Sequence, residues 1–414
     1  MLKAAVLMTM GLAYGDLAQA ATPPTVSTRA MAIHRQVLTL DTHLDTPAHF
    51  TRPGWDFAAR HSLATDTSQV DLPRMRTGAL DGGFFVIYTP QGPRTPDATA
   101  KARDDAIMRA VEIREMAARL HDRVALATDA ADAERIITSG RTIIYQSIEN
   151  AYPVSGDLGL LDTFYALGVR MVGVVHFSNN DLGDSSTDPK GAEWHGLSPL
   201  GRQLVAKANS LGMVLDASHG SDEVLDQLLD LSRAPIILSH SGCKGVYEHP
   251  RNVDDPRLQR LAAQGGVVQI NSFGTYLAAT VPDVERDKAL QELNTRYGKR
   301  HEMTMAQTAA FVAERDAILQ RYPGFERSYE QFAAHLLHAL RVLGPDHVGI
   351  GLDWDGGGGV SGMKDVTSIP RITQTLLDAG YGEGDIAKIW GGNVLRVLKA
   401  VEAMADHPQS SSSQ

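Results

Sequence analysis

The sequence predicts a single parallel (β/α)₈ barrel of the TIM type, and three observations lead to this fold class. Short apolar, β-branched runs recur eight times along the chain, and segments with helical periodicity lie between most of them. The chain has 414 residues, which is enough for one large barrel with insertions. A proline-, glycine- or serine-rich linker that would divide it into separate domains is missing from the sequence. Strand–helix alternation repeated eight times favours a closed barrel over an open sheet.

The eight predicted strands are short continuous runs, as expected for strands that are covered on both faces. They are residues 37–43, 83–88, 142–149, 171–177, 213–219, 235–241, 266–272 and 347–353. Helices are predicted at residues 98–121, 158–167, 199–211 and 222–231. Residues 274–330 break this rhythm, because the stretch is charged, helix-forming and much longer than a normal connection. We interpret it as a helical excursion after the seventh strand that could serve as a lid, a homodimer contact or a decoration.

The composition is that of an ordinary globular protein and excludes several other classes. Hydrophobic residues make up 43% of the chain and charged residues 21%. The 39 basic and 49 acidic residues give a net charge of −10 without a basic stripe, so nucleic acid is not expected as a partner. Cys243 is the only cysteine, which excludes an internal disulfide and a cysteine-based zinc site, and we expect its thiol to be inert. Any metal must therefore be bound by His, Asp and Glu.

The amino-terminal segment has the features of a targeting sequence. Lys3 precedes a mostly apolar run at 4–15, and Ala-Gln-Ala at 18–20 matches the small-x-small pattern of a cleavage site. We therefore expect a secreted or periplasmic protein without a stable membrane anchor, because the run is shorter than the ~20 residues that cross a bilayer. The predicted division of the chain is a signal peptide at 1–20, a single catalytic barrel domain at 21–406 and a disordered serine-rich tail at 407–414.

Polar side chains stand at the carboxyl ends of six of the eight predicted strands. They are His43 with Asp45, Glu149, His176, His219, His240 and Asp353. In parallel barrels, active sites form at this carboxyl-terminal face. A polar side chain that ends an apolar run is costly to bury unless it has a partner. A single such histidine is more often structural, but the complete set predicts a metal site.

The spacing and the residue types indicate which metal chemistry this rim could support. His43 and Asp45 are two residues apart on a strand, so both can point into the barrel. Histidine and carboxylate ligands without cysteine suit zinc or a similar divalent ion. Four such ligands plus Glu149, whose carboxylate can bridge, are enough for two ions. Two ions about 3.5–4 Å apart would hold a water and lower its pKa towards neutrality, which predicts a hydrolase.

Seven stretches match a known family in order and in spacing. They are DTHLDTP (41–47), QSIEN (146–150), GVRMVGVVHFSNND (168–181), GMVLDASH (212–219), PIILSHSGCKGVYEHPRNVDD (235–255), DHVGIGLDWDG (346–356) and GGNVLRVL (391–398). With them the chain resembles the membrane (renal-type) dipeptidase family of the metal-dependent amidohydrolase superfamily. The resemblance runs from about residue 38 to residue 398 and is highly specific, whereas His-x-Asp alone would be weak.

The resemblance implies a role for each rim residue. The family's ligands fall on His43 and Asp45 for one zinc and on His219 and His240 for the other. Glu149 falls on the position that bridges the two ions together with a hydroxide. Asn150 follows it where the family often has glycine, which is one departure from the pattern, and the long excursion is another.

The same resemblance implies a zinc-dependent dipeptidase in which the bridging hydroxide attacks the scissile carbonyl. Asp353 is expected to take the proton of that water and to give it to the leaving amine. His176 is expected to donate to the oxyanion, and Arg251 to bind the carboxylate of the dipeptide through a forked pair of hydrogen bonds. Strand alternation alone cannot choose between Asp353 and Asp355. The family pattern favours Asp353, and we expect Asp355 to cap the glycine-rich turn at 356–359.

Two other function classes are also compatible with the sequence. One is a related binuclear metal amidohydrolase that acts on another amide or on a lactone. Arg251 argues for substrates with a carboxylate, since a neutral lactone gives it no partner. The other is a non-catalytic periplasmic binding protein with a degenerate barrel, against which the complete ligand set and Asp353 argue. His335 and His338 are assigned structural roles on an amphipathic helix.

Overall fold

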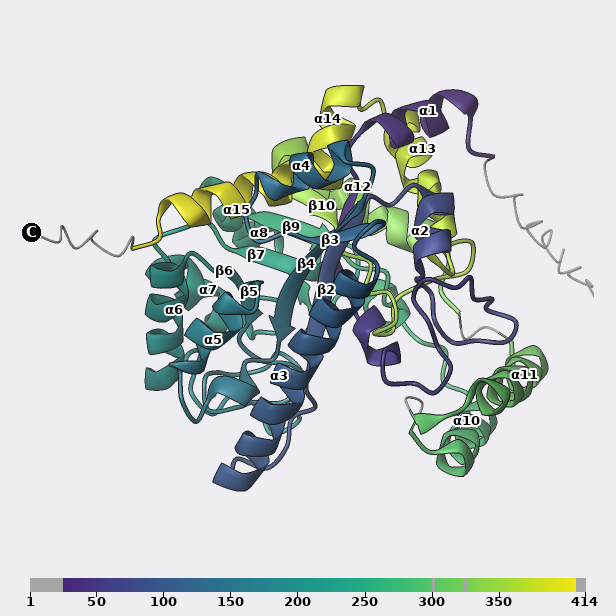
Figure 1. Cartoon of the computed structure of the whole chain (residues 1–414), viewed down its shortest axis with the longest axis horizontal. Coiled ribbons are helices and arrows are strands. Elements are labelled where there is room, and N and C mark those ends of the chain that lie inside the picture. The colour runs from purple at the N-terminus through teal and green to yellow at the C-terminus, as the bar shows by residue number, and fades with distance from the viewer. Residues whose placement is uncertain (1–24, 300–301, 324–325, 407–414) are drawn as a thin grey trace, which may run out of the picture.

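Eight parallel strands form a nearly closed barrel at the centre of the computed structural model, which describes residues 25–299, 302–323 and 326–406 (Figure 1). In sheet order the strands are β1 (Leu40–Leu44), β2 (Gly82–Tyr88), β4 (Thr142–Glu149), β5 (Val169–Gly173), β6 (Val214–Asp216), β7 (Ile237–Cys243), β9 (Val267–Ile270) and β10 (Val348–Ile350). A parallel bridge between Leu44 and Trp354 joins the two ends of the sheet. The predicted (β/α)₈ fold class is confirmed.

All eight predicted strands belong to this barrel, but four of them, β5, β6, β9 and β10, end earlier than predicted. β5, β6 and β10 stop at Gly173, Asp216 and Ile350, so the polar residues expected at their ends lie in the loops just beyond. For two of these loops the physical reason is visible in the backbone. His219 has a φ of 66° and Asp353 a φ of 62°, and a strand cannot continue through this left-handed conformation.

Helices cover the outside of the barrel, and local capping explains their bounds. The main ones are α1 (Thr28–Gln36), α2 (Leu72–Gly78), α3 (Pro96–Arg119), α4 (Asp132–Thr138), α5 (Leu160–Ala166), α6 (Pro199–Leu211), α7 (Asp222–Leu231), α8 (Asp255–Ala263), α12 (Tyr329–Leu343), α13 (Pro370–Asp378) and α15 (Asn393–Ala403). α6 and α7 have the predicted bounds. Ser198 caps α6 ahead of Pro199, and Gly212 ends it in a left-handed conformation.

Two short strands lie beside the barrel and were not predicted. β3 (Val124–Leu126) pairs with β4, and β8 (Asn252–Val253) pairs with β7. Runs of two or three residues carry too little periodicity to be recognised in a sequence.

α15 closes the amino-terminal end of the barrel. Its buried Val394 and Leu398 pack in one cluster with residues near the starts of strands, such as Leu40 and Val267. This apolar plug leaves the carboxyl-terminal end of the barrel available for polar side chains.

The excursion after the seventh barrel strand is helical, as predicted. It contains α9 (Gly274–Leu277), α10 (Val284–Tyr297) and α11 (Met305–Arg321). α10 and α11 lie side by side at the lower right of Figure 1, away from the strands. They share a small core that includes Leu293 and Phe311.

None of the helices described is both long and apolar enough to cross a membrane. The predicted signal peptide at 1–20 and the predicted tail at 407–414 lie outside the described residues.

Candidate metal centre

The side chains predicted from the strand ends, together with Arg251 from the family resemblance, meet at the carboxyl-terminal mouth of the barrel. Each of them is at most 9% exposed. They are His43, Asp45, Glu149, His176, His219, His240, Arg251 and Asp353. His43, Glu149 and His240 lie within β1, β4 and β7, and the others lie in the loops that follow the strands.

Glu149 lies at the centre of this group. Its Oε1 atom is 3.1 Å from Nε2 of His219 and 3.4 Å from Nε2 of His240. The same oxygen is 3.6 Å from Nε2 of His176 and 3.7 Å from Nε2 of His43. Four imidazole rings from four barrel strands or the loops after them thus face one carboxylate oxygen.

Metal-ligating atoms fall into three overlapping groups, within each of which all atoms lie within 4.8 Å of one another. The groups are His43, Glu149 and His240; Glu149, His176 and His219; and His43, Asp45 and Asp353. Glu149 belongs to two groups, which is the placement that a bridging carboxylate needs. His176 also joins a group of ligand atoms, although the sequence suggested only a substrate-contacting and catalytic role for it.

The hydrogen bonding of these histidines fits a bound cation. Nε2 of His43 is buried without a hydrogen-bond partner among the described residues. Nε2 of His219 and Nε2 of His240 are 2.9 Å apart. Burial, with the positive charge of Arg251 among the further causes, holds the pKa of both rings well below the ordinary value, so they are neutral. Neutral imidazole nitrogens that converge beside a carboxylate are a ligand set for a divalent ion such as zinc.

The electrostatics of the centre also favour positive charge. Burial lowers the pKa of His43, but the carboxylates of Glu149 and Asp45 outweigh it and raise that pKa well above its ordinary value. Burial likewise raises the pKa of Glu149, yet His176 and His43 bring it well below its ordinary value. The carboxylates that retain a proton on His43 would attract a divalent cation for the same reason.

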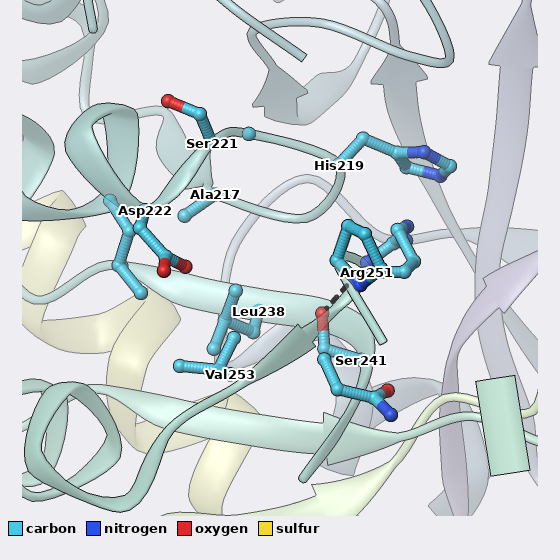
Figure 2. A pocket seen from close by; sticks show the side chains of 12 residues that line it. Ala217, His219, Ser221, Asp222, Leu238, Ser241, Arg251 and Val253 are labelled. Carbon is cyan, nitrogen blue, oxygen red and sulfur yellow. Dashed lines mark hydrogen bonds between the residues drawn. The ribbon is translucent and has the colours of Figure 1, made fainter. Parts of the chain in front are cut away.

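Arg251 is buried directly behind the histidines, only 2% exposed. Its Nη1 donates to Oγ of Ser241 over 3.0 Å, and its Nη2 donates to the carbonyl of His240 over 2.9 Å. Figure 2 shows the contact between Arg251 and Ser241 beside a small pocket that His219 also lines. The guanidinium carbon is 5.6 Å from the ring centroid of Tyr276. Burial lowers the pKa of Arg251, so a bound carboxylate would relieve an unfavourable buried charge.

Comparison with known proteins identifies the family. The family model described as membrane dipeptidase (peptidase family M19) matches residues 27–412. The chain belongs to the membrane dipeptidase family. It is a hydrolase, a metallo-dipeptidase, and the resemblance seen in the sequence is confirmed.

Individual members of the family are similar over most of their length. Dipeptidase tcpJ of Claviceps purpurea is 30% identical over 365 residues, which cover 86% of this chain and 76% of that protein. The probable dipeptidase PvdM from Pseudomonas aeruginosa has 31% identity and a TM-score of 0.76, with 91% and 98% of the two chains covered. A metallopeptidase from Rhodobacter sphaeroides, bound to a phosphinate mimic of L-Ala-D-Ala, has 25% identity and a TM-score of 0.69, with 88% and 99% covered.

The loop ends that surround the centre of this dipeptidase hold strained backbone. Asn150, His219, Asp353 and Asp355 are non-glycine residues with φ between 62° and 69°. Such conformations cost free energy and are typical of functional sites. The φ of 63° at Asn150 also explains the departure from the family pattern, since glycine and asparagine are the residues that adopt it most readily.

The interpretation of Asp355 as a cap of the glycine-rich turn is wrong. The amide of Gly358 in that turn donates to the backbone carbonyl of Asp353 over 2.7 Å, so the backbone closes the turn itself. The Asp355 carboxylate instead accepts from the hydroxyl of Thr46 and from the amide of Gln69. It therefore ties the last barrel loop to the first, whereas Asp353 faces the ligand group.

The residues that were assigned structural roles are buried or paired outside the centre. His335 accepts from the amide of Cys243 and donates to the carbonyl of Leu277. His338 lies 2.7 Å from a carboxylate oxygen of Asp255. Burial raises the pKa of the Cys243 thiol to about 12, which disfavours the reactive thiolate.

Sequence reasoning missed two aromatic residues beside His176. Oη of Tyr88 lies 3.5 Å from Nδ1 of His176, and the ring centroid of Phe177 is 3.9 Å from that of His176. Tyr88 is the last residue of a predicted strand, so its place at the same rim was a signal that could have identified it.

Proposed function

We propose that the chain is a zinc-dependent dipeptidase with two Zn²⁺ ions, which hydrolyses dipeptides that carry a free C-terminal carboxylate. The observation that carries this proposal is the position of Glu149, whose Oε1 lies within 3.7 Å of four histidine nitrogens. His43 and Asp45 would hold one ion, His219 and His240 the other, and Glu149 both. When bound, the ions supply Lewis acidity and lower the pKa of a bridging water so that hydroxide forms near neutral pH.

The protein's own groups divide the remaining work. Burial raises the pKa of Asp353 well above its ordinary value, against the opposing effect of His43 and with the support of the Asp45 charge. Asp353 is thus suited to accept a proton from water and to pass it to the leaving amine. His176 would donate to the oxygen that gains negative charge, and Arg251 would bind the substrate carboxylate.

The choice of dipeptides rests on Arg251 and on the relatives. The guanidinium of Arg251 is held in place by Ser241 and by the carbonyl of His240. It can therefore bind a substrate carboxylate only close to the scissile bond. The similar Rhodobacter sphaeroides enzyme was crystallised with a mimic of L-Ala-D-Ala, which supports including D-residues among the substrates to be tested.

The decisive experiment combines elemental analysis of purified protein with hydrolysis of a dipeptide panel. The panel contains L- and D-residues at the second position, C-terminally amidated dipeptides and a lactone. We expect two zinc ions per chain and turnover of free dipeptides only. One ion per fully active chain would overturn the binuclear centre, and preferred hydrolysis of the lactone would overturn the dipeptide assignment. Glu149→Gln should lose most of both ions and nearly all turnover.

We also propose that the protein is exported and that its signal peptide is cleaved after Ala20. The support is the Ala-Gln-Ala pattern that follows the apolar amino-terminal run. Mass spectrometry of the protein from a periplasmic fraction should find a mature chain that begins at Ala21. A cytoplasmic protein that retains Met1 would contradict this. The homodimer stays a prediction that size-exclusion chromatography with light scattering can test.

A further inference from the structure

A buried pair that the catalytic roles above leave unused lies beneath the histidines. Asp216 is the last residue of β6, and Ser239 precedes His240 on β7; they are 4% and 0% exposed. Oδ1 of Asp216 accepts from the backbone amides of Ser218 and Ser239, both over 2.9 Å. Its Oδ2 accepts from the hydroxyl of Ser239 over 2.5 Å. The carboxylate is thus held in one orientation, and it fixes the hydroxyl of Ser239 in turn.

The orientation of this hydroxyl determines what it can offer to its other neighbours. A serine hydroxyl has one hydrogen, and that hydrogen is committed to Asp216. Its oxygen therefore faces Nδ1 of His240 over 2.8 Å and Nδ1 of His43 over 3.5 Å as an acceptor only. Both rings can satisfy it by carrying their hydrogen on Nδ1. In the neutral form that a metal ligand must adopt, this tautomer leaves a free lone pair on Nε2.

The free lone pairs lie where a metal would need them. Nε2 of His240 and Nε2 of His43 both face Oε1 of Glu149. The two rings are packed together, with their centroids 3.7 Å apart. His43 and His240 belong to the two different zinc sites of the proposed function, so one serine oxygen contacts a ligand of each.

We propose that Asp216 and Ser239 form a positioning pair that sets the tautomer of His43 and His240 together, and so prepares both metal sites at once. This inference rests on the proposed binuclear centre. It assigns a task to two residues that touch neither the substrate nor the ions. Partners of this kind fix the ring orientation of metal ligands, and losing one typically costs 10–100-fold in metal affinity.

Asp216→Asn is the sharpest test, because it preserves shape while reversing one hydrogen bond. The two backbone amides would keep the carbonyl oxygen of the new side chain, so its NH₂ group would face Ser239. That group would donate to the serine oxygen, and the serine hydrogen would then point at a histidine Nδ1. The histidine proton would move to Nε2, where it blocks metal binding.

Two measurements test the pair, beginning with competition against a chelator, which gives the affinity for each zinc ion. We expect Ser239→Ala and Asp216→Asn each to lower the affinity for both zinc ions by about 10–100-fold. Ser198→Ala is the matched control, since it also removes a buried serine hydroxyl with two hydrogen bonds, at the start of α6. It should lower the melting temperature without changing either affinity. Wild-type affinity in both pair variants would overturn the proposal, and so would weakening of one ion alone.

The second measurement is nitrogen NMR of the histidine rings in the metal-free, ¹⁵N-histidine-labelled protein. In the wild type His240 should be protonated at Nδ1, and in Asp216→Asn at Nε2. An unchanged tautomer in that variant would overturn the pair's role. The NMR experiment uses metal-free protein, so its result does not depend on whether two zinc ions bind. The binuclear proposal is tested separately, by the number of zinc ions bound to the wild type.

Discussion

The hydroxyl of Thr46 donates to Oδ2 of Asp355 over 2.8 Å, which joins the first and last loops of the barrel. The amide of Gln69 donates to the other carboxylate oxygen over 2.5 Å, and Nε2 of His49 lies 3.3 Å from it. Asp355 is separated by one residue from Asp353, and both have left-handed φ angles. The first loop thus holds the strained turn that presents Asp353 to the centre.

Replacing Asp355 should therefore impair catalysis without touching the substrate. Asp355→Ala leaves the donors of Thr46 and Gln69 unpaired, which should cost about 2–3 kcal/mol of unfolding free energy. We expect kcat to fall more than KM rises, because Asp353 is no longer held. Asp346→Ala is the control, since this exposed carboxylate pairs with Lys388 on the surface and should change unfolding free energy by less than ~0.5 kcal/mol. Equal losses in the two variants would contradict the role of Asp355.

Gly356→Ala should damage the centre more severely. An added methyl group would overlap Oδ2 of Asp45 and Oδ1 of Asp353, so the two carboxylates could not keep their positions. We expect kcat/KM to fall by at least about 100-fold, which corresponds to ~2.7 kcal/mol, together with loss of part of the bound metal. Gly384→Ala in α14 (Glu383–Ala387) is the matched control, because an added methyl group there has no atom within 4 Å. Full activity in Gly356→Ala would contradict this prediction, because it would mean that the loop can move enough to fit the methyl group.

Much of the barrel and of its centre could be predicted because buried strands have a recognisable pattern of residue types in the sequence. Strands covered on both faces read as apolar runs, and a His or carboxylate that ends such a run needs a partner. Glu149, His219 and His240 can therefore be placed at the site from the sequence alone. The turns after β6 and β10 could not be predicted, since left-handed φ at a histidine or an aspartate has no reliable sequence signal.

Contacts between loops far apart in the chain were equally hidden. Asp355 is separated from Thr46 by 309 positions, and alternation along one strand says nothing about such a partner. Asp216 and Ser239 read as ordinary polar residues in apolar runs. Only the register of β6 beside β7 brings them together beneath the histidines.

Acid should destabilise the protein through His335. Burial lowers its pKa to about 4 from an ordinary value of 6.5. In the folded protein its Nδ1 accepts from the amide of Cys243. The unfolded chain therefore binds the proton first as pH falls, and stability is lost from about pH 6.5 down to about pH 4. The loss should reach about 2 kcal/mol at pH 5. Urea unfolding at pH 7 and pH 5 should give a smaller difference for His335→Gln than for the wild type. An equal difference would mean that other groups cause the acid sensitivity.

Arg251 should determine that substrates end in a free carboxylate. Its guanidinium is buried and held by Ser241 and His240, so removing a substrate carboxylate leaves an unpaired charge in the site. Arg251→Ala should cut kcat/KM for free dipeptides by about 100-fold or more. Amidated dipeptides should be poor substrates of the wild type and should lose little further in this variant.

Arg251→Lys distinguishes the effect of the paired hydrogen bonds of Arg251 from the effect of its positive charge. A lysine keeps the positive charge but cannot form two parallel hydrogen bonds to a carboxylate, so we expect an intermediate loss. Because Arg251 also bonds to the carbonyl of His240, zinc content must be measured in each variant. A loss of activity that follows the loss of zinc, equally for free and amidated substrates, would assign Arg251 to the metal centre instead.

Tripeptides should be excluded, since a further residue moves the carboxylate away from the guanidinium. If the wild type cleaves tripeptides or amidated dipeptides as fast as free dipeptides, Arg251 is not a carboxylate anchor.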